Sequence, residues 1–325
     1  MIREKVSVII PAYNSGKTIG QCLRSIYSST YIPDEVIVLD DSSQDSTVEI
    51  VKQFDCALIR NKTRLFQAAG RNIGAKKSKG DLLLFMDSDI ELKKDSIELV
   101  LLSIIKAKAS AVCGVYDEFN PYNNIFSQYK HLSMVFNQMG SKIWIKYPNT
   151  SFLLIWKDAF LASAGFCEQF TTSEDLDFGH LLARNGHKIF FDKNIKVIHN
   201  KYLDIRGFIK RDYKTAKEIT LIALKNLFLG IITEWPVRLS FRISFFLVPL
   251  LYLSLFYTFF PGHNNKPFFF LFILCFILNI KFISFLYRRK GLVFALSSFF
   301  ILLLHITICL AGTITGILKF LFMLS

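Results

Sequence analysis

The chain has 325 residues, of which 52% are hydrophobic and 33 are phenylalanine, and its mean hydropathy of +0.36 is too high for a purely soluble protein. Its formal net charge is +13, and every acidic residue lies at or before Glu234, so a charged N-terminal part precedes an apolar C-terminal part. This distribution favours an anionic membrane surface as a partner and argues against nucleic acid, for which no known motif is present. The six cysteines include no Cys-x-x-Cys pair, which argues against a zinc site or disulfide framework and indicates a reducing compartment.

Short apolar runs alternate with segments of helical spacing over about the first 200 residues. The apolar runs predict strands at 6–10, 35–39, 57–59, 82–86, 111–115, 151–155, 188–191 and 196–199. The helical segments are 16–27, 47–54 with Ser46 as N-cap, 67–77, 94–106, 158–164 and 174–185, whereas 116–146 predicts loops and short helices. This alternation predicts an α/β domain with a mostly parallel, doubly wound, Rossmann-like sheet.

One of these strands ends in two carboxylates. Leu82 to Met86 is apolar throughout, and Asp87 and Asp89 follow it. Alternate residues of an extended backbone project to the same face, so both carboxylates can converge on one point. Oxygen ligands of this kind suit Mg²⁺ or Mn²⁺, which takes its other ligands from water and substrate phosphates. An Asp-rich turn without metal is the alternative interpretation.

Other polar residues follow other predicted strands. Asn14 lies just after the first strand, and Asp40 and Asp41 end the second. Ligands of doubly wound sheets bind beyond the carboxyl ends of the strands, so a binding site is expected at this rim. The two aspartates either accept hydrogen bonds from a base or ribose or cap the helix that follows, and both interpretations stay open.

Two acidic residues begin a later helix. Glu174 and Asp175 lie where the helix dipole stabilises carboxylates, which by itself explains their presence. Transfer to a hydroxyl needs a carboxylate that accepts the proton at hydrogen-bond distance, and we assign that role to Asp175. His199, which ends a predicted strand, is either a third metal ligand or a structural histidine.

Two phosphate-binding motifs are excluded. Residues 14–18 resemble the end of a P-loop, but that motif needs glycine where Pro11 stands, and proline has no N–H and cannot take a positive φ. Residues 70–74 do not complete a dinucleotide-binding motif, because they do not follow a strand.

The C-terminal part has the pattern of a membrane anchor. Residues 206–229 mix basic and apolar side chains and predict an amphipathic helix, either on the membrane surface or on an ordinary domain surface. Apolar stretches at 241–260, 268–287 and 292–311 have the roughly 20 residues that a span needs, and 261–267 predicts a turn. The basic residues 288–290 predict a cytoplasmic loop, which places an N-terminal domain without a signal peptide on the cytoplasmic side of a plasma or inner membrane.

Three domains are therefore expected: 1–204, an interfacial helical segment at 205–238, and a multi-pass transmembrane region at 239–325. Gly312 and Gly316 have the spacing of close helix packing, and His305 within the third span predicts an interhelical hydrogen bond.

Taken in chain order, five motifs resemble the family 2 inverting glycosyltransferases, which have the GT-A fold. The motifs are residues 6–14, 38–47, 69–74 and 80–89 and the pair 174–175, within about residues 4 to 200. The resemblance implies a nucleotide-sugar site made of Pro11, Ala12, Tyr13, Asn14, Asp40, Asp41, Arg71, Asp87 and Ser88. It also implies Mn²⁺ or Mg²⁺ on Asp87 and Asp89, to which we add His199 as a candidate ligand, and Asp175 as the general base.

These residues predict a membrane-bound, metal-dependent glycosyltransferase. It would move one sugar from a nucleotide-diphosphate sugar to a lipid-linked or membrane-proximal acceptor in cell-envelope polysaccharide or glycolipid synthesis. The Gln-x-x-Arg-Trp signature of processive synthases is absent, and Ile90 after Asp89 departs from the polyprenyl-phosphate sugar synthases. The alternatives are a sugar-1-phosphate nucleotidyltransferase and a non-catalytic, nucleotide-binding membrane subunit.

Overall fold

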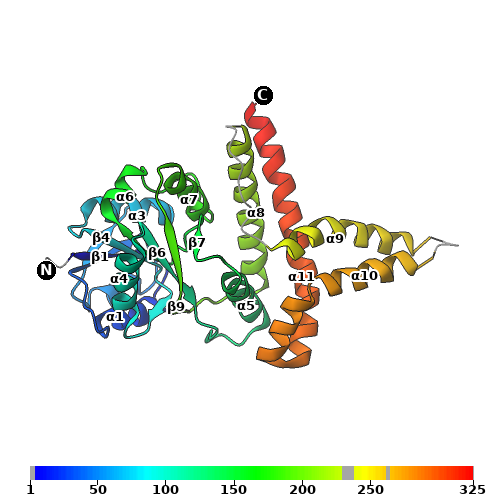
Figure 1. Ribbon diagram of the computed structural model, residues 1–325, viewed down its shortest axis with the longest axis horizontal. Coiled ribbons are helices and arrows are strands. Elements are labelled where there is room, and N and C mark those ends of the chain that lie inside the picture. Colours follow the sequence, from blue (N-terminus) through cyan, green and yellow to red (C-terminus); the bar gives the residue numbers. More distant parts are fainter. Residues whose placement is uncertain (1–3, 229–237, 261–263, 325) are drawn as a thin grey trace. The chain divides into compact units, whose positions relative to one another are not determined.

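The computed structural model describes residues 4–228, 238–260 and 264–324. These residues form two compact units (Figure 1), the first made of the chain up to Tyr122 together with 138–201 and the second of 123–137 together with the chain from Tyr202 onward. The first unit thus ends close to the expected boundary at 204, but a segment from its middle, 123–137, packs with the C-terminal helices instead.

The first unit is built on one sheet. Its strands are β1 (Val6–Ala12), β2 (Glu35–Asp40), β3 (Ala57–Arg60), β4 (Leu82–Met86), β5 (Ile90–Leu92), β6 (Ala111–Tyr116), β7 (Trp144–Ile145), β8 (Phe152–Trp156) and β9 (Ile189–His199). They lie in the order β3-β2-β1-β4-β8-β6-β9-β5, with β7 on β9. The first four are mutually parallel, as expected, whereas β8 is antiparallel to both β4 and β6.

Helices cover this sheet: α1 (Ile19–Tyr27), α2 (Thr47–Val51), α3 (Phe66–Lys77), α4 (Ser96–Ala107), α6 (Lys157–Ala162) and α7 (Glu174–Arg184). The strand β4 is buried along its whole length. Its Phe85 packs with Phe160 and Phe166, which in turn contact Phe178 of α7. This aromatic cluster fixes the start of α7 relative to the end of β4, because burial of large aromatic side chains dominates core energetics.

Several local features differ from the sequence-based expectations. Helix α5 (Ile125–Met139) fills much of the segment where loops and short helices were expected, and the two short strands near residue 190 form the single strand β9. Ser46 stands at the N-cap position of α2, as predicted, but its side chain makes no cap bond. Asp45 does this instead, accepting the Thr47 N–H at 3.1 Å.

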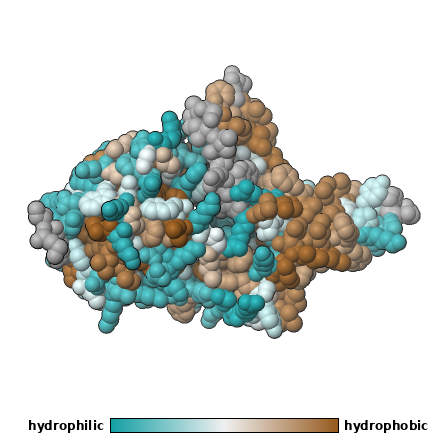
Figure 2. Space-filling view, viewed as in Figure 1, coloured by the Kyte–Doolittle hydropathy of each residue, from teal (hydrophilic) through white to brown (hydrophobic). Residues whose placement is uncertain are grey.

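The second unit is helical. It contains α5 up to Asn137, α8 (Ile205–Phe228), α9 (Leu239–Tyr257), α10 (Lys266–Leu278) and α11 (Ile280–Leu324). Helices α8 and α11 run side by side, and α9 and α10 form a pair (Figure 1). Hydrophobic residues gather on the surface over α9 and α10 (Figure 2).

Two of these helices are long and apolar enough to cross a membrane, namely Leu239–Tyr257 and Ile280–Met323 among the described residues. The expected middle span, 268–287, is divided at Asn279 between α10, which has only 13 residues, and α11. The basic residues 288–290 lie within α11 just before a kink at Gly291 (φ 82°), not in a loop. Parts of the predicted turn (261–263) and interfacial segment (229–237) lie outside the described residues.

The two glycines of α11 pack against α8, as their spacing predicts. A Cβ at Gly312 would lie 2.4 Å from the Tyr213 carbonyl oxygen, and one at Gly316 would lie 2.9 Å from that of Lys217. His305 also makes the interhelical contact expected of it, 3.2 Å from the Tyr129 hydroxyl.

We therefore expect Gly312→Val to separate α11 from α8. Overpacking of this kind costs about 1–3 kcal/mol, because the backbone of α8 must move. Ala311→Val is the matched control, since Ala311 is exposed on the same helix. In thermal unfolding of the detergent-solubilised chain, Gly312→Val should lower Tm and Ala311→Val should not; equal Tm values would contradict the packing described.

Candidate active site

The loops that follow β1, β2 and β4 meet at one edge of the sheet. The Asp41 N–H donates to the Ala12 carbonyl at 2.8 Å, and the Asn14 N–H donates to Ser43 Oγ at 2.9 Å, joining the first two loops. The hydroxyls of Ser15 and Ser88 lie 2.7 Å apart, which joins the first loop to the third. Because β1, β2 and β4 are parallel, the predicted rim of polar residues forms one surface.

Tyr13 offers an exposed ring on this surface. Its side chain is 37% exposed, and the Arg64 guanidinium lies 3.8 Å above the ring centroid. Pro11 and Ala12 precede it at the end of β1, and Asn14 takes a positive φ of 47° and accepts the Gln44 N–H at 2.8 Å. An aromatic ring with an arginine beside it provides a stacking surface for a planar base and a positive charge for a phosphate.

Asp40 and Asp41 have different environments. The fully buried Asp40 accepts the Ser43 N–H at 3.3 Å and faces Arg60 Nε at 3.3 Å. Asp41 accepts the backbone N–H groups of Leu65 and Phe66 at 2.7 and 2.8 Å, so its carboxylate satisfies the free N-terminus of α3. Asp41 therefore caps α3, whose first residue stands 25 positions further on, and not α2, the following helix that the capping alternative named.

The buried Arg71 side chain links two carboxylates of the site, Asp87 and Glu174. Its side chain is only 2% exposed, and its guanidinium lies 2.6 Å from Glu174 Oε1 and 2.6 Å from Asp87 Oδ1. Burial alone would lower the pKa of Arg71, but these two carboxylates outweigh it and raise the pKa above its usual range. Arg71 thus acts on the predicted site through Asp87 and Glu174.

Asp87 and Asp89 lie at the end of β4, where the sequence predicts a metal site. Asp87 Oδ2 accepts a hydrogen bond from the Ser151 hydroxyl at 2.7 Å, and Arg71 binds the other carboxylate oxygen, Oδ1. Asp89 Oδ2 lies 2.8 Å from Lys201 Nζ, and its Oδ1 lies 3.5 Å from His199 Nε2. Burial alone would raise the pKa of Asp89, but Lys201 and His199 outweigh it and hold the pKa well below its usual range, so the carboxylate is charged.

These residues fit a divalent cation that shares its coordination with a substrate. Asp89 Oδ1 is buried with His199 Nε2 3.5 Å away, and each Asp87 oxygen keeps a further lone pair. No group of three or more His, Cys, Asp or Glu side chains in the described part of the chain surrounds one point. Mg²⁺ and Mn²⁺ do not need one, because one or two carboxylates suffice when phosphate oxygens and water complete the shell. The ring of His199 stacks on Tyr116, with centroids 4.5 Å apart.

Asp175 has the properties of a proton acceptor. It lies in the first turn of α7, half-buried, next to Glu174. Burial and the neighbouring Glu174 charge raise its pKa to about 7. A carboxyl group with this pKa is about half deprotonated at neutral pH and is basic enough to take a proton from a hydroxyl.

Three contacts of this site were not predicted from the sequence, namely those of Ser151, Lys201 and Glu174. Ser151 and Lys201 carry no motif, and each reaches its aspartate only through pairing of distant strands. Glu174 had a detectable signal, because it precedes the predicted base, but its partner Arg71 stands 103 residues earlier.

About half of the chain matches a family of known proteins. Residues 7–161 match the model of the glycosyl transferase family 2. These residues are therefore similar to a family 2 glycosyltransferase domain. The chain is 31% identical over 130 residues to glycosyltransferase GlyA of Streptococcus pneumoniae, covering 39% of this chain and 19% of GlyA. It is 27% identical over 224 residues to the O-antigen chain rhamnosyltransferase RfbN of Salmonella typhimurium, covering 65% of this chain and 71% of RfbN.

The chain spans less than two thirds of the length of most of these relatives, 37% to 60% for the next three after GlyA. A solved structure with the same fold is the mannosyltransferase PcManGT from Pyrobaculum calidifontis in complex with GDP-Man and Mn²⁺. Its TM-score is 0.59 at 17% identity, over 99% of this chain and 88% of that one. The expected fold class, a GT-A-like α/β domain followed by a helical region, is thereby confirmed.

Proposed function

We propose that this chain is a membrane-anchored, metal-dependent inverting glycosyltransferase. It transfers one sugar from a nucleotide-diphosphate sugar to a hydroxyl of a lipid-linked or membrane-proximal acceptor. The observation that carries the proposal is the connection of the predicted base to the predicted phosphate site: Glu174, beside Asp175, and Asp87 share the buried Arg71. This arrangement supports a base and a diphosphate-binding carboxylate held in fixed relation to each other.

Each part of the site has a separate task in this proposal. Tyr13 and Asp40 bind the base and ribose of the donor, and Asp87 and Asp89 hold Mn²⁺ or Mg²⁺ with the diphosphate. The bound cation supplies positive charge that stabilises the departing diphosphate. Asp175 accepts the proton of the acceptor hydroxyl as that oxygen attacks the anomeric carbon from the side opposite the diphosphate. One displacement of this kind inverts the anomeric configuration.

Similar proteins support the donor and product classes, and composition supports the location. PcManGT is described with GDP-Man and Mn²⁺, and RfbN as an O-antigen chain enzyme, which supports a nucleotide-sugar donor and a cell-envelope product here. The two apolar helices α9 and α11 support anchoring in a plasma or inner membrane. The basic residues of α8 favour the cytoplasmic face for the first unit.

Activity should depend on pH through Asp175. Because its pKa is raised to about 7, the carboxyl is protonated below that pH and cannot accept a proton, so the rate should fall about tenfold per pH unit there and level off above. Initial rates at saturating donor, measured across this range, test the assignment. A rate that does not change across pH 7 would contradict it.

The product distinguishes the proposed function from its alternatives. A donor labelled in the sugar is incubated with the purified chain, Mn²⁺ and a membrane extract that supplies acceptors. The proposal predicts label in the lipid or polysaccharide fraction and release of a nucleoside diphosphate. Release of pyrophosphate from sugar 1-phosphate and a nucleoside triphosphate would favour a nucleotidyltransferase, and no turnover of any nucleotide sugar would favour a non-catalytic subunit.

A further inference from the structure

Tyr116 lies beside the predicted cation site and is held there by its backbone. It is the last residue of β6, where it pairs with Val197 of β9, two residues before His199. Its N–H donates to Gln138 Oε1 at 2.8 Å, and its side chain is buried. The residue therefore has a fixed orientation, although it belongs to none of the five motifs that resemble the family 2 glycosyltransferases.

The hydroxyl of Tyr116 is connected to Asp87 through one serine. It lies 3.0 Å from Ser151 Oγ and 3.1 Å from Asn149 Oδ1, and its single hydrogen can be donated to either acceptor. The Ser151 hydroxyl donates its own hydrogen to Asp87 Oδ2 at 2.7 Å, so its oxygen accepts from Tyr116. Two hydroxyls in such a chain polarise each other, which strengthens the bond to Asp87.

The ring of Tyr116 contacts the other half of the site. It stacks on the ring of His199, with centroids 4.5 Å apart and planes 16° from parallel. His199 Nε2 lies 3.5 Å from Asp89 Oδ1, and the His199 side chain is only 4% exposed. Stacked aromatic rings attract each other beyond the effect of the area that they bury, so Tyr116 restrains the ring that faces Asp89.

One side chain thus supports both carboxylates that follow β4. A divalent cation needs its ligands at fixed positions, and the loss of a group that orients a ligand typically lowers metal affinity about 10–100-fold. We propose that Tyr116 is a positioning residue for the cation site. Its hydroxyl orients Asp87 through Ser151. Its ring orients Asp89 through His199. This inference rests on the proposed function, because it takes the two aspartates as ligands of the cation.

The Mn²⁺ dependence of nucleotide binding tests this role without any acceptor or turnover. UDP and GDP are titrated by calorimetry into the full chain and into Tyr116→Phe, in Mn²⁺ and in chelator. The variant keeps the ring and loses the hydroxyl, so the nucleotide that binds should bind about fivefold more weakly in Mn²⁺ and within about twofold in chelator. A tyrosine that only stabilises the fold would weaken binding in both conditions alike or in neither, and either result would overturn the proposal.

Two further variants test the two connections separately. Ser151→Ala removes the direct bond to Asp87 and should weaken binding in Mn²⁺ at least about tenfold. Tyr116→Phe combined with Ser151→Ala should bind no more weakly than Ser151→Ala alone, because the tyrosine hydroxyl acts through the serine, and additive losses would overturn this connection. Tyr116→Leu also removes the ring and should weaken binding more than Tyr116→Phe does. Equal losses in these two variants would overturn the connection through His199.

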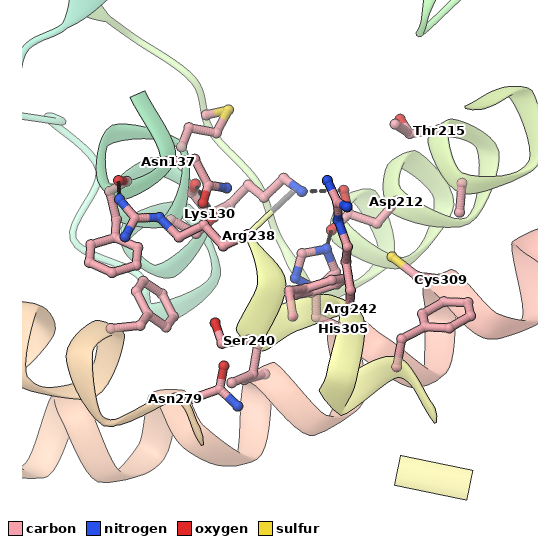
Figure 3. Close-up of a pocket in the computed structure, with 18 of the residues that line it drawn as sticks. Lys130, Asn137, Asp212, Thr215, Arg238, Ser240, Arg242, Asn279, His305 and Cys309 are labelled. Atoms are coloured by element: carbon pink, nitrogen blue, oxygen red, sulfur yellow. Dashed lines mark hydrogen bonds and ion pairs between the residues drawn. The ribbon is translucent and has the colours of Figure 1, made fainter. Parts of the chain in front are cut away.

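Tyr129→Phe is the matched control. Tyr129 is a buried tyrosine of the second unit, and its hydroxyl lies 3.2 Å from a histidine nitrogen, His305 Nδ1. The other ring nitrogen of His305 lies 3.2 Å from Asp212 Oδ2 (Figure 3). The control removes the same hydroxyl from a similar group of side chains, so nucleotide binding in Mn²⁺ should stay within about twofold.

Two outcomes with these chains would also overturn the proposal. Equal losses in Tyr129→Phe and Tyr116→Phe would attribute the effect to general destabilisation. A lack of any Mn²⁺ effect in the unchanged chain would overturn this inference together with the metal part of the proposed function, whereas unchanged binding by Tyr116→Phe would overturn this inference alone.

Discussion

Asp175→Asn should reduce the turnover number by about 10²–10⁴-fold, the usual contribution of a positioned general base. Asparagine has nearly the same shape as aspartate but cannot accept the proton of the acceptor hydroxyl. The side chain also loses one charge from a site where burial and Glu174 already disfavour it, so the fold should be at least as stable as before. Donor binding, which depends on other residues, should be nearly unchanged.

Two measurements separate this outcome from a general defect. Affinity for the donor, measured by calorimetry in Mn²⁺, should match that of the unchanged chain. Asp158→Asn is the matched control, because Asp158 is an exposed aspartate in the first turn of α6, another helix of the same unit, and it should retain full activity. Retained turnover in Asp175→Asn would remove Asp175 from the mechanism.

Arg71→Met should destabilise the first unit by about 3–5 kcal/mol, the cost of breaking a buried ion pair by removing one partner. Glu174, with a side chain only 5% exposed, would be left as a buried charge without its closest counter-charge. A loss of this size should lower the Tm of the unit by on the order of 10 °C. Arg24→Met, at an exposed position of α1, should change Tm little.

A double variant tests the cause of this effect. Replacing both partners of a buried pair by apolar residues removes the unpaired charge, so Arg71→Met with Glu174→Leu should be more stable than Arg71→Met alone. If the double variant is instead less stable by the sum of both single changes, then Arg71 and Glu174 do not depend on each other.

The sequence predicts the first half of the sheet well because its signals are local. The apolar run from Leu82 to Met86 is buried as expected, and the carboxylates that follow it lie at the predicted rim. The antiparallel strand β8 could not be placed in this way, because its position between β4 and β6 depends on pairing across about 70 and about 40 residues, respectively. Periodicity identifies a strand but not its neighbours.

The contacts of individual site residues could not be predicted for the same reason, because their partners are distant in the sequence. Asp41 follows a strand and was open to two interpretations, and only the structure places it at the N-terminus of α3. Arg71 belongs to a recognisable motif, yet its two carboxylate partners stand 16 and 103 residues away. The segment 123–137 lacks a clear period because α5 contacts other helices with polar as well as apolar residues, including Lys130.

If Asp87 and Asp89 hold a divalent cation together with the diphosphate, binding of a nucleoside diphosphate should depend on Mn²⁺. UDP and GDP are titrated into the full chain and into Asp89→Asn by calorimetry, in Mn²⁺ and in chelator. One of the two nucleotides should bind at least about tenfold more tightly in Mn²⁺ than in chelator, and Asp89→Asn should lose this difference. Equal affinity in Mn²⁺ and in chelator, or an unchanged Mn²⁺ effect in Asp89→Asn, would contradict it.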